Sequence, residues 1–463
     1  MTNIMFELHV SMSLPFLDRD DEQRRLHRFM RGDDSRLAVL YGRRRCGKST
    51  LAQRMCEEGD VYALADERES SLQIQALASE IARVVPEFDA ARYPSWEALF
   101  TSLETRVERL NLVLDEFPYL VSSAPELPSV IQRHLDRPGS RRTRLLLCGS
   151  SQRMMQGLAL DRSAPLYGRA QEILRLAPLL PGWIRDALGI DGAAAVEAWA
   201  VWGGVPRYWE LAQRYPSLHE AIRDLVLHRH GVLHDEPQGL LLDDMRSATQ
   251  ASTLLALVGA GCNRLSEIAA RMGKPAGALT RPLAHLIELG YLRKDVPFGE
   301  DERSSKRTLY RIDDPLVAFW FRFVQPARTL LQRDLLEPVE ARIGKAFPQH
   351  CAEAWEVLAR ESVPRLRIGG IGWGPASRWW GNGRDGPIEF DVVAESLDGD
   401  SILIGEARWA SRPDVARWRA ELRARAESAP FLRGRRLVCA LWVKEGAEGP
   451  DVVTPAEVMA ALR

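Results

Sequence analysis

The sequence predicts an α/β protein whose first domain is a parallel sheet covered by helices on both faces. Short apolar runs typical of buried parallel strands alternate with helical patterns through the first 180 residues, and this alternation indicates a parallel sheet. The expected strands are 37–42, 61–65, 111–115, 144–148 and 172–178, and the expected helices are 48–57, 70–84, 94–109 and 125–135.

The rest of the chain changes character twice. Residues 181–240 show helical patterns alone, and residues 248–320 show two or three short helices followed by a hairpin. From about 345 a helix precedes several strands, a helix at 413–427 and a final strand at 436–443. The sequence therefore predicts a second, C-terminal α/β domain beyond an all-helical segment and a small helical segment with a hairpin.

Composition sets the outer limits on function. The chain has 463 residues, enough for about three domains, and a net charge of −1, so any binding of nucleic acid must come from local patches. Its six cysteines form no CxxC pair, which argues against a zinc ribbon and fits a reducing compartment. The N-terminal residues show no signal-peptide pattern, and no apolar run approaches the ~18 residues that span a bilayer. We expect a cytoplasmic protein with no membrane contact.

A phosphate-binding loop follows the first expected strand. Residues 42–50 read GRRRCGKST and match the pattern GxxxxGK[ST] between a strand and a helix. The glycines let backbone N–H groups surround a phosphate at a helix N-terminus. Lys48 would bridge the β- and γ-phosphates of ATP, and the Ser49 hydroxyl would ligate Mg²⁺. The predicted nucleotide contacts in the loop are Gly42, Cys46, Gly47, Lys48, Ser49 and Thr50.

Two acids end the third expected strand. The apolar residues 112–114 lead directly into Asp115 and Glu116. Asp115 would hold the magnesium through water, and Glu116 would orient the water that attacks the γ-phosphate. The alternative is a strand that simply ends in an acidic turn.

At this point the chain resembles a known family, the archaeal-type ATPases of the AAA+/STAND-like branch of P-loop proteins. The segments that carry the resemblance, besides the phosphate loop, are FLDR (16–19), LDEFPYL (114–120), CGSS (148–151), PLYGR (165–169) and GGVPRYW (203–209). The resemblance implies the sheet order 5-1-4-3-2, a sensor role for Ser150 near the γ-phosphate, and packing of Pro206 against adenine from a helical lid. It also implies that Arg169 is an arginine finger or a cis sensor. The alternatives are a strand-end hydroxyl for Ser150 and a helix-end salt bridge for Arg169.

The segment 265–312 resembles a winged helix. Two short helices, 265–272 and 276–289, precede two strands at 290–298 and 307–312 separated by a polar loop. In winged helices that bind DNA the second helix enters the major groove. Its solvent face and the wing offer cations for phosphate contacts, namely Arg281, His285, Arg293, Lys294, Lys306 and Arg307. The alternative is a winged helix that only braces neighbouring domains.

The last segment resembles a restriction-endonuclease-like domain of the PD-(D/E)XK type. Asp391 lies on one expected strand, and Glu406 lies on the next, two residues before Arg408. Residues two apart on a strand point the same way, so Glu406 and residue 408 would face one site beside Asp391. The two carboxylates would bind Mg²⁺, which activates water, and Glu356 could add a ligand. The chain departs from the pattern at 408, where Arg replaces the catalytic Lys; a guanidinium cannot act as a base but could still stabilise charge on the phosphate, so Arg408 stays a catalytic candidate.

Together these features predict an ATP hydrolase with ATP and Mg²⁺ as cofactors, whose nucleotide state controls a DNA-binding, nuclease-like C-terminal region. The alternative is an ATP-dependent switch with an inactive nuclease-like domain that binds nucleic acid or a protein. Some relatives form rings and others are monomers, so a homo-oligomer stays open. The predicted domains are 1–178 (P-loop ATPase core), 179–245 (helical lid), 246–322 (winged helix) and 323–463 (nuclease-like domain).

Overall fold

Five parallel strands form the N-terminal sheet in the computed structural model of the chain. Their order is β2-β3-β4-β1-β5, so the expected order 5-1-4-3-2 is confirmed. The strands are β1 (Leu37–Gly42), β2 (Val61–Leu64), β3 (Leu110–Asp115), β4 (Thr143–Gly149) and β5 (Glu172–Leu176). Each expected strand is present within two residues at either end; β1 to β4 are mainly apolar runs between polar turns, and β5 also contains Glu172 and Arg175.

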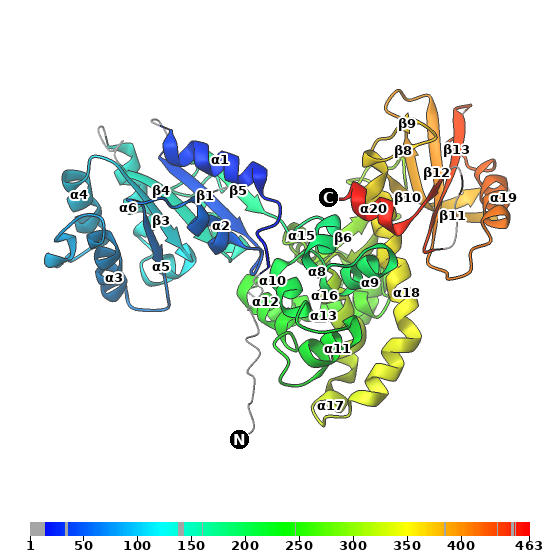
Figure 1. Ribbon diagram of the computed structural model, residues 1–463, viewed down its shortest axis with the longest axis horizontal. Helices are drawn as coiled ribbons and strands as arrows, with labels where there is room; N and C mark the ends of the chain where they lie inside the picture. Colours follow the sequence, from blue (N-terminus) through cyan, green and yellow to red (C-terminus); the bar gives the residue numbers. More distant parts are fainter. Residues whose placement is uncertain are drawn as a thin grey trace, which may run out of the picture. The chain divides into compact units, whose positions relative to one another are not determined.

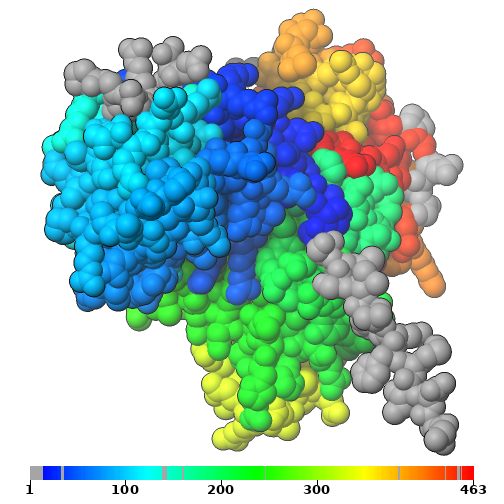
Figure 2. Space-filling model, turned by 60° about the vertical axis from the view of Figure 1, so that its left-hand side comes forward, coloured from blue at the N-terminus to red at the C-terminus, as the bar shows by residue number. Residues whose placement is uncertain are grey.

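The structure describes residues 14–32, 36–137, 143–159, 161–245, 247–383, 386–432, 434–445, 449 and 451–463. The first 13 residues, which contribute to the prediction that no signal peptide is present, lie outside the described residues. Two compact units divide the chain. The sheet unit comprises Asp18–Pro178 and Leu240–Ser247, and the C-terminal unit comprises Leu179–Gly239 and Ala248–Arg463 together with the N-terminal residues up to Leu17. The sheet unit forms one rounded body, blue to cyan in Figure 2.

Helices cover the sheet on both faces. Alternate residues of the strands, such as Leu37 and Val39 on β1, pack in one core with four helices that follow β2 and β3. Those helices are α3 (Ser70–Ala82), α4 (Trp96–Arg106), α5 (Phe117–Ser123) and α6 (Leu127–Asp136). The opposite face carries α1 (Asp20–Arg31) and α2 (Lys48–Met55) (Figure 1). The short α7 (Gln152–Ala159) follows β4.

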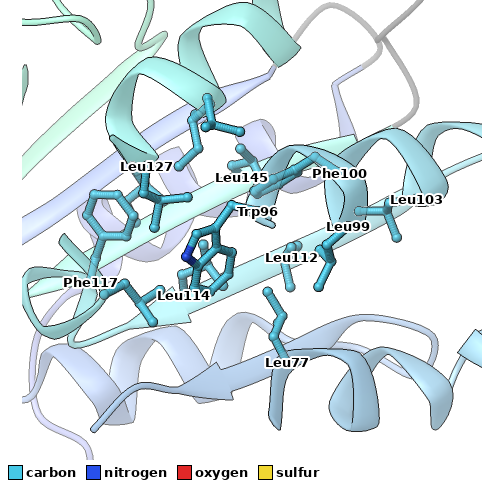
Figure 3. Close-up of a cluster of buried hydrophobic side chains, with 14 of the residues drawn as sticks. Leu77, Trp96, Leu99, Phe100, Leu103, Leu112, Leu114, Phe117, Leu127 and Leu145 are labelled. Carbon is cyan, nitrogen blue, oxygen red and sulfur yellow. The ribbon is translucent and has the colours of Figure 1, made fainter. Parts of the chain in front are cut away.

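Trp96 is buried in the core between the sheet and helices α3 to α6. Its ring lies over β3 beside Leu112 and Leu114, with Leu99 of the same helix next to it (Figure 3). The indole is 1% exposed, and its N–H donates to the Ser70 hydroxyl at 2.9 Å. A buried Trp with its polar atom satisfied contributes its full apolar area, so its removal should cost about 3–5 kcal/mol. This core holds β3, and hence its terminal acids, in place.

The C-terminal unit begins with an all-helical segment, as expected. It contains α8 (Ile184–Leu188), α9 (Gly192–Trp202), α10 (Pro206–Ala212), α11 (Leu218–Ile222), a π-turn at Arg223–Leu227 and the first residues of α12 (Glu236–Asp244). The expectation that 436–443 is the last element is wrong: β14 (Val452–Val453) and α20 (Pro455–Ala461) follow it, and α20 packs against α9. The approach is close, because the Gly182 N–H donates to the Leu462 carbonyl at 2.9 Å and a Cβ on Gly182 would overlap the Met459 carbonyl.

The expected winged-helix arrangement is present. After α13 (Ala248–Gly259) come α14 (Leu265–Met272), α15 (Ala276–Glu288) and the antiparallel pair β6 (Leu292–Asp295) and β7 (Leu309–Ile312). Apolar residues at helical spacing bury one side of α15, namely Leu279, Leu283 and Leu286.

A second sheet, of order β10-β11-β12-β13-β14, forms the last part of the chain. Its longer strands are β10 (Ser377–Gly383), β11 (Gly386–Glu395), β12 (Ser401–Arg408) and β13 (Arg436–Val443). The long α18 (Leu336–Ser362) packs on β11 and β12, and α19 (Val415–Ala426) packs on β12 and β13. Shorter elements are α16 (Pro315–Phe319), α17 (Arg328–Leu331), β8 (Arg367–Ile368) and β9 (Ile371–Gly372). No described helix is long and apolar enough to cross a membrane.

Candidate functional site

The phosphate loop joins the end of β1 to the start of α2. Gly42 has φ = 151°, and a Cβ there would overlap the Leu176 carbonyl of the paired strand β5, so this position accepts glycine alone. Gly47 has φ = 91° and caps α2, whose first residue is Lys48. The loop thereby presents the N-terminus of α2, with its unpaired N–H groups, at the carboxyl edge of the sheet.

Lys48 is buried within this loop. It is 4% exposed, and its Nζ donates to the Arg43 carbonyl at 2.9 Å. Burial lowers the pKa of the Lys48 ammonium, against the opposing effects of Cys46, Glu116 and Asp115 nearby. A buried cation of this kind is stabilised by an anion, so the loop is electrostatically suited to a phosphate group. Ser49 follows it in the first turn of α2, half-buried, and Thr50 is exposed.

Asp115 ends β3 and is fully buried. Its Oδ2 accepts a hydrogen bond from the Tyr62 hydroxyl at 2.6 Å, and its Oδ1 accepts from the Glu116 N–H at 2.9 Å. Burial, followed by the hydrogen bond to Asp115, raises the pKa of the Tyr62 phenol. Sequence reasoning missed Tyr62, whose only signal is its place on the neighbouring strand β2.

Glu116 and Ser150 come together at the same edge. The Ser150 hydroxyl donates to Glu116 Oε1 at 2.7 Å, and the Ser150 N–H lies 3.4 Å from Oε2. Glu116 has φ = 52°, a left-handed conformation that costs a non-glycine residue about 1 kcal/mol and that concentrates at functional sites. Glu116 and Ser150 directly follow β3 and β4 and are 34 residues apart in sequence. Their contact places both at the edge of the sheet where Asp115 and Lys48 lie.

Arg169 lies elsewhere. Its guanidinium donates to both Asp136 carboxylate oxygens at 3.0 and 2.8 Å, and this contact raises its pKa. Asp136 ends α6 beside Leu135, whose carbonyl accepts from Arg36 just before β1. This is the amino edge of the sheet, about 20 Å from the phosphate loop by the length of β1. Arg169 therefore forms a salt bridge at the end of α6 and does not reach the phosphate loop of this chain.

Arg19 is a further residue at the loop that sequence reasoning used only as part of a family motif. It is 5% exposed, and its Nη2 lies 2.6 Å from the Ala177 carbonyl and 3.4 Å from the Cys46 carbonyl. Arg19 thus ties the phosphate loop to the chain just beyond β5. Pro206, the predicted adenine contact, is the first residue of α10 and belongs to the C-terminal unit.

In the winged-helix segment the second helix, α15, is exposed, whereas the wing contacts the C-terminal sheet. Lys274, Ala278 and Arg281 are exposed at α15 and the turn before it. By contrast, wing residue Arg307 donates to the Trp380 carbonyl of β10 at 2.7 Å, and the Phe298 ring lies 5.6 Å from that of Phe431. The wing is therefore fastened to the C-terminal sheet.

The other predicted wing cations differ in exposure. Arg293 pairs with Asp295 at 3.3 Å and Asp313 at 3.5 Å, and Lys294 contacts the Glu302 carbonyl. Lys306 is exposed, and His285 on α15 is half-buried.

The predicted nuclease acids lie on paired strands. The pairing of β11 with β12 ends at Val392 and Gly405, and Asp391 and Glu406 are the next residue on each strand, with Asp391 at a bulge in β11. Asp391 Oδ2 accepts from the Ala407 N–H at 3.0 Å. Glu406 is 8% exposed and holds an arginine on each carboxylate oxygen, Arg408 on Oε1 and Arg425 of α19 on Oε2.

The third acid is engaged as well. Glu356 of α18 pairs with Arg378 at 3.6 Å, and burial raises its pKa with a further contribution from Asp391. Lys444 pairs with Glu197 at 3.0 Å and lies over the Trp409 ring. Among the described residues, no three His, Cys, Asp or Glu side chains come together as a set that could hold a metal ion.

Comparison with known proteins agrees with this geometry. Residues 16–211 match the model of an ATPase domain predominantly from Archaea, and residues 247–296 match the IclR helix-turn-helix domain. Residues 320–420 match a family of archaeal and bacterial proteins of unknown function.

An uncharacterised protein of Methanocaldococcus jannaschii is 27% identical over 86% of this chain and 88% of its own length. A Walker-type ATPase of Pyrococcus abyssi has a TM-score of 0.51 at 20% identity and matches 66% of this chain and 95% of that one. The ORC2 protein of Aeropyrum pernix has a TM-score of 0.45 at 17% identity and matches 70% and 96%.

The sheet order, the phosphate loop and the acids at its edge define a P-loop ATPase. More closely, residues 16–211 are similar to the archaeal ATPase domain, and residues 247–296 are similar to the IclR helix-turn-helix.

Proposed function

We propose that the chain uses its ATPase cycle to control binding of DNA by the winged helix. In the catalytic step Lys48 contacts the β- and γ-phosphates, and Glu116 orients the attacking water while Ser150 fixes the Glu116 carboxylate. Ser49 and the buried Asp115 fit Mg²⁺, because a hydroxyl and a carboxylate at this edge are oxygen ligands of the kind that it prefers. The bound ion supplies charge neutralisation to the phosphates.

Control of DNA binding by the nucleotide is supported by contacts within the C-terminal unit, where both the lid helices and the wing are attached to the last domain. The lid helix α9 contacts the last domain at several points: the Ala200 carbonyl lies 2.8 Å from His350 Nε2, and Glu197 pairs with Lys444. The wing is fastened to the same domain through Arg307. A lid that moves with nucleotide state would carry the winged helix with it as one body.

Binding to DNA would use α15. Its exposed beginning has small side chains, Ala276, Gly277 and Ala278, which allow the helix backbone to approach a groove closely. Arg281 and Lys274 beside them supply cations for phosphates.

The test is DNA affinity measured without nucleotide, with ADP and with a slowly hydrolysed ATP analogue. We expect affinity to differ by about tenfold between nucleotide states, as for a coupling of 1–2 kcal/mol. Lys48→Ala should remove that difference, and Arg281→Ala should weaken binding in every state. DNA binding that ignores nucleotide in the unmodified chain would contradict the control step.

A second candidate is an ATP-regulated nuclease, favoured by the hydrogen bond that brings the Asp391 carboxylate to the Ala407 N–H, next to Glu406 on β12. Nicking of supercoiled plasmid that needs a divalent metal and is lost in Asp391→Ala would establish it. If the chain hydrolyses ATP but does not nick the plasmid, the result supports ATP-controlled DNA binding without cleavage. In either case, light scattering with and without ATP measures the molar mass and hence the oligomeric state of the protein.

A further inference from the structure

The nuclease-like site contains one more arginine than the sequence pattern predicts. Glu406 is the acid that would hold a metal in the pattern, yet Arg408 and Arg425 each take one of its two carboxylate oxygens. The pattern's two carboxylates and one lysine sum to −1, whereas Asp391 and Glu406 together with Arg408 and Arg425 sum to 0. A divalent cation at this position would have to displace an arginine, so these residues do not fit the metal.

Both arginines are held by more than Glu406. Arg425 Nη1 lies 3.3 Å from the Glu389 carbonyl, and its guanidinium carbon lies 5.9 Å from the centre of the Phe390 ring. The guanidinium carbon of Arg408 lies 5.7 Å from the centre of the Trp418 ring of α19. These contacts restrict both side chains and reduce the entropy lost when they bind a ligand.

The arginines also retain capacity for a ligand. Their side chains are 43% and 36% exposed, so solvent and ligands can reach them. The Nε of Arg408 is buried and has no hydrogen-bond partner, which is an unsatisfied donor at this site. A guanidinium presents several donors in a planar fork that matches the oxygens of a phosphate.

We propose that this site is a metal-independent clamp for a nucleic-acid phosphodiester, formed by Arg408 and Arg425 and restrained by Glu406. Glu406 holds the two guanidinium groups apart from each other, and the N–H donors that Glu406 does not occupy bind the phosphate oxygens. The clamp rests on the proposed binding of DNA but adds a second point of contact, on the last domain. It assigns the C-terminal domain to gripping the backbone and not to cutting it.

The first test compares variants of the full chain for binding to a short fluorescent DNA duplex in excess EDTA, over a range of salt concentrations. Arg425→Gln should weaken binding and reduce the slope of log affinity against log salt by about 0.9, the value for one lost phosphate contact. Glu406→Gln keeps the shape, releases both arginines, and should tighten binding. Arg417→Gln is the matched control on α19, because Arg417 pairs with Glu421 at 2.7 Å and lies on the exposed side.

Equal losses for Arg417→Gln and Arg425→Gln would overturn the clamp, since net charge alone would then explain the effect. So would weaker binding in Glu406→Gln. If the unmodified chain binds no DNA in any nucleotide state, the proposed function fails first. If DNA binding depends on Arg281 but not on Arg425 or Arg408, the clamp alone fails.

A second test does not depend on DNA. Titration of Mn²⁺ into the nucleotide-free chain, followed by calorimetry, should show no site that depends on Asp391. Replacing the arginines with the pattern's residues, in Arg408→Lys with Arg425→Ala, should create one such site, and adding Asp391→Asn should remove it. An Asp391-dependent Mn²⁺ site in the unmodified chain would show that the arginines do not exclude the metal.

Discussion

Replacing Ser150 by Ala tests whether the Glu116 carboxylate must be fixed for hydrolysis. The Ser150 hydroxyl donates to Glu116 Oε1 at 2.7 Å in a partly buried place, and a hydrogen bond to a charged group contributes about 1.5–3 kcal/mol. The Ser150 N–H, 3.4 Å from the other oxygen, remains in the variant. We therefore take the lower end of that range, which corresponds to a fall in kcat of about tenfold.

The assay is steady-state phosphate release at saturating ATP, with KM for ATP measured alongside. KM should change little, because Lys48 and the loop N–H groups bind the nucleotide and are untouched. Ser151→Ala is the control: its hydroxyl is buried without a hydrogen-bond partner and lies one residue away. A kcat that stays within about twofold of the unmodified chain, or that rises, would refute the reasoning that Ser150 holds Glu116 in its working position.

Three further predictions concern the loop, the buried histidine and the wing. Gly42→Ala should abolish ATP binding, measured by fluorescent-nucleotide titration, because its Cβ would overlap the Leu176 carbonyl. Burial lowers the pKa of His350 from 6.5 to about 4, so the folded chain binds fewer protons than the unfolded chain and loses up to about 1.4 kcal/mol per pH unit as pH falls through that window. His350→Leu should flatten this part of the pH dependence of the thermal unfolding midpoint, and an unchanged slope would contradict the assignment. Arg307→Ala should loosen the wing and speed amide exchange in β10, whereas the exposed Arg303→Ala should not.

The sequence predicted the sheet well because β1 and β2 are apolar throughout and β3 and β4 are mainly apolar, although β5 contains Glu172 and Arg175. A strand that is buried on both faces is a continuous apolar run, so its ends are easy to recognise in the sequence. The bounds expected for β1 agree with the structure at both ends. The helix α5 was missed because it is short, follows Glu116 directly and begins Phe117-Pro118, which resembles a turn. The terminal helix α20 was missed because its seven residues are too few for a helical period to be clear.

The site was predicted where a motif is continuous in sequence and missed where it depends on packing. The phosphate loop, Asp115 and Glu116 each belong to a local pattern. Tyr62 reaches this edge of the sheet from β2, and nothing in its own neighbourhood distinguishes it. Arg19 belongs to the FLDR motif, but the motif does not reveal its contact with the phosphate loop. For Arg169 the sequence leaves two roles open, an arginine finger or cis sensor and a helix-end salt bridge, and the salt bridge partner, Asp136, is visible only in the fold.

The nuclease-like strand shows why a motif alone does not decide chemistry. Its sequence changes one residue of the pattern, Lys to Arg at 408, which could be a harmless exchange of one cation for another. The second arginine on Glu406 comes from α19, nineteen residues along the chain, and its contact exists only because that helix packs on β12. A site with one arginine could still accept a cation on the free carboxylate oxygen, but the second arginine holds that oxygen and cancels the net negative charge that would attract a cation. The function of such a domain is therefore set by the charges that the fold gathers around the motif, and Arg425 is the residue whose replacement tests this.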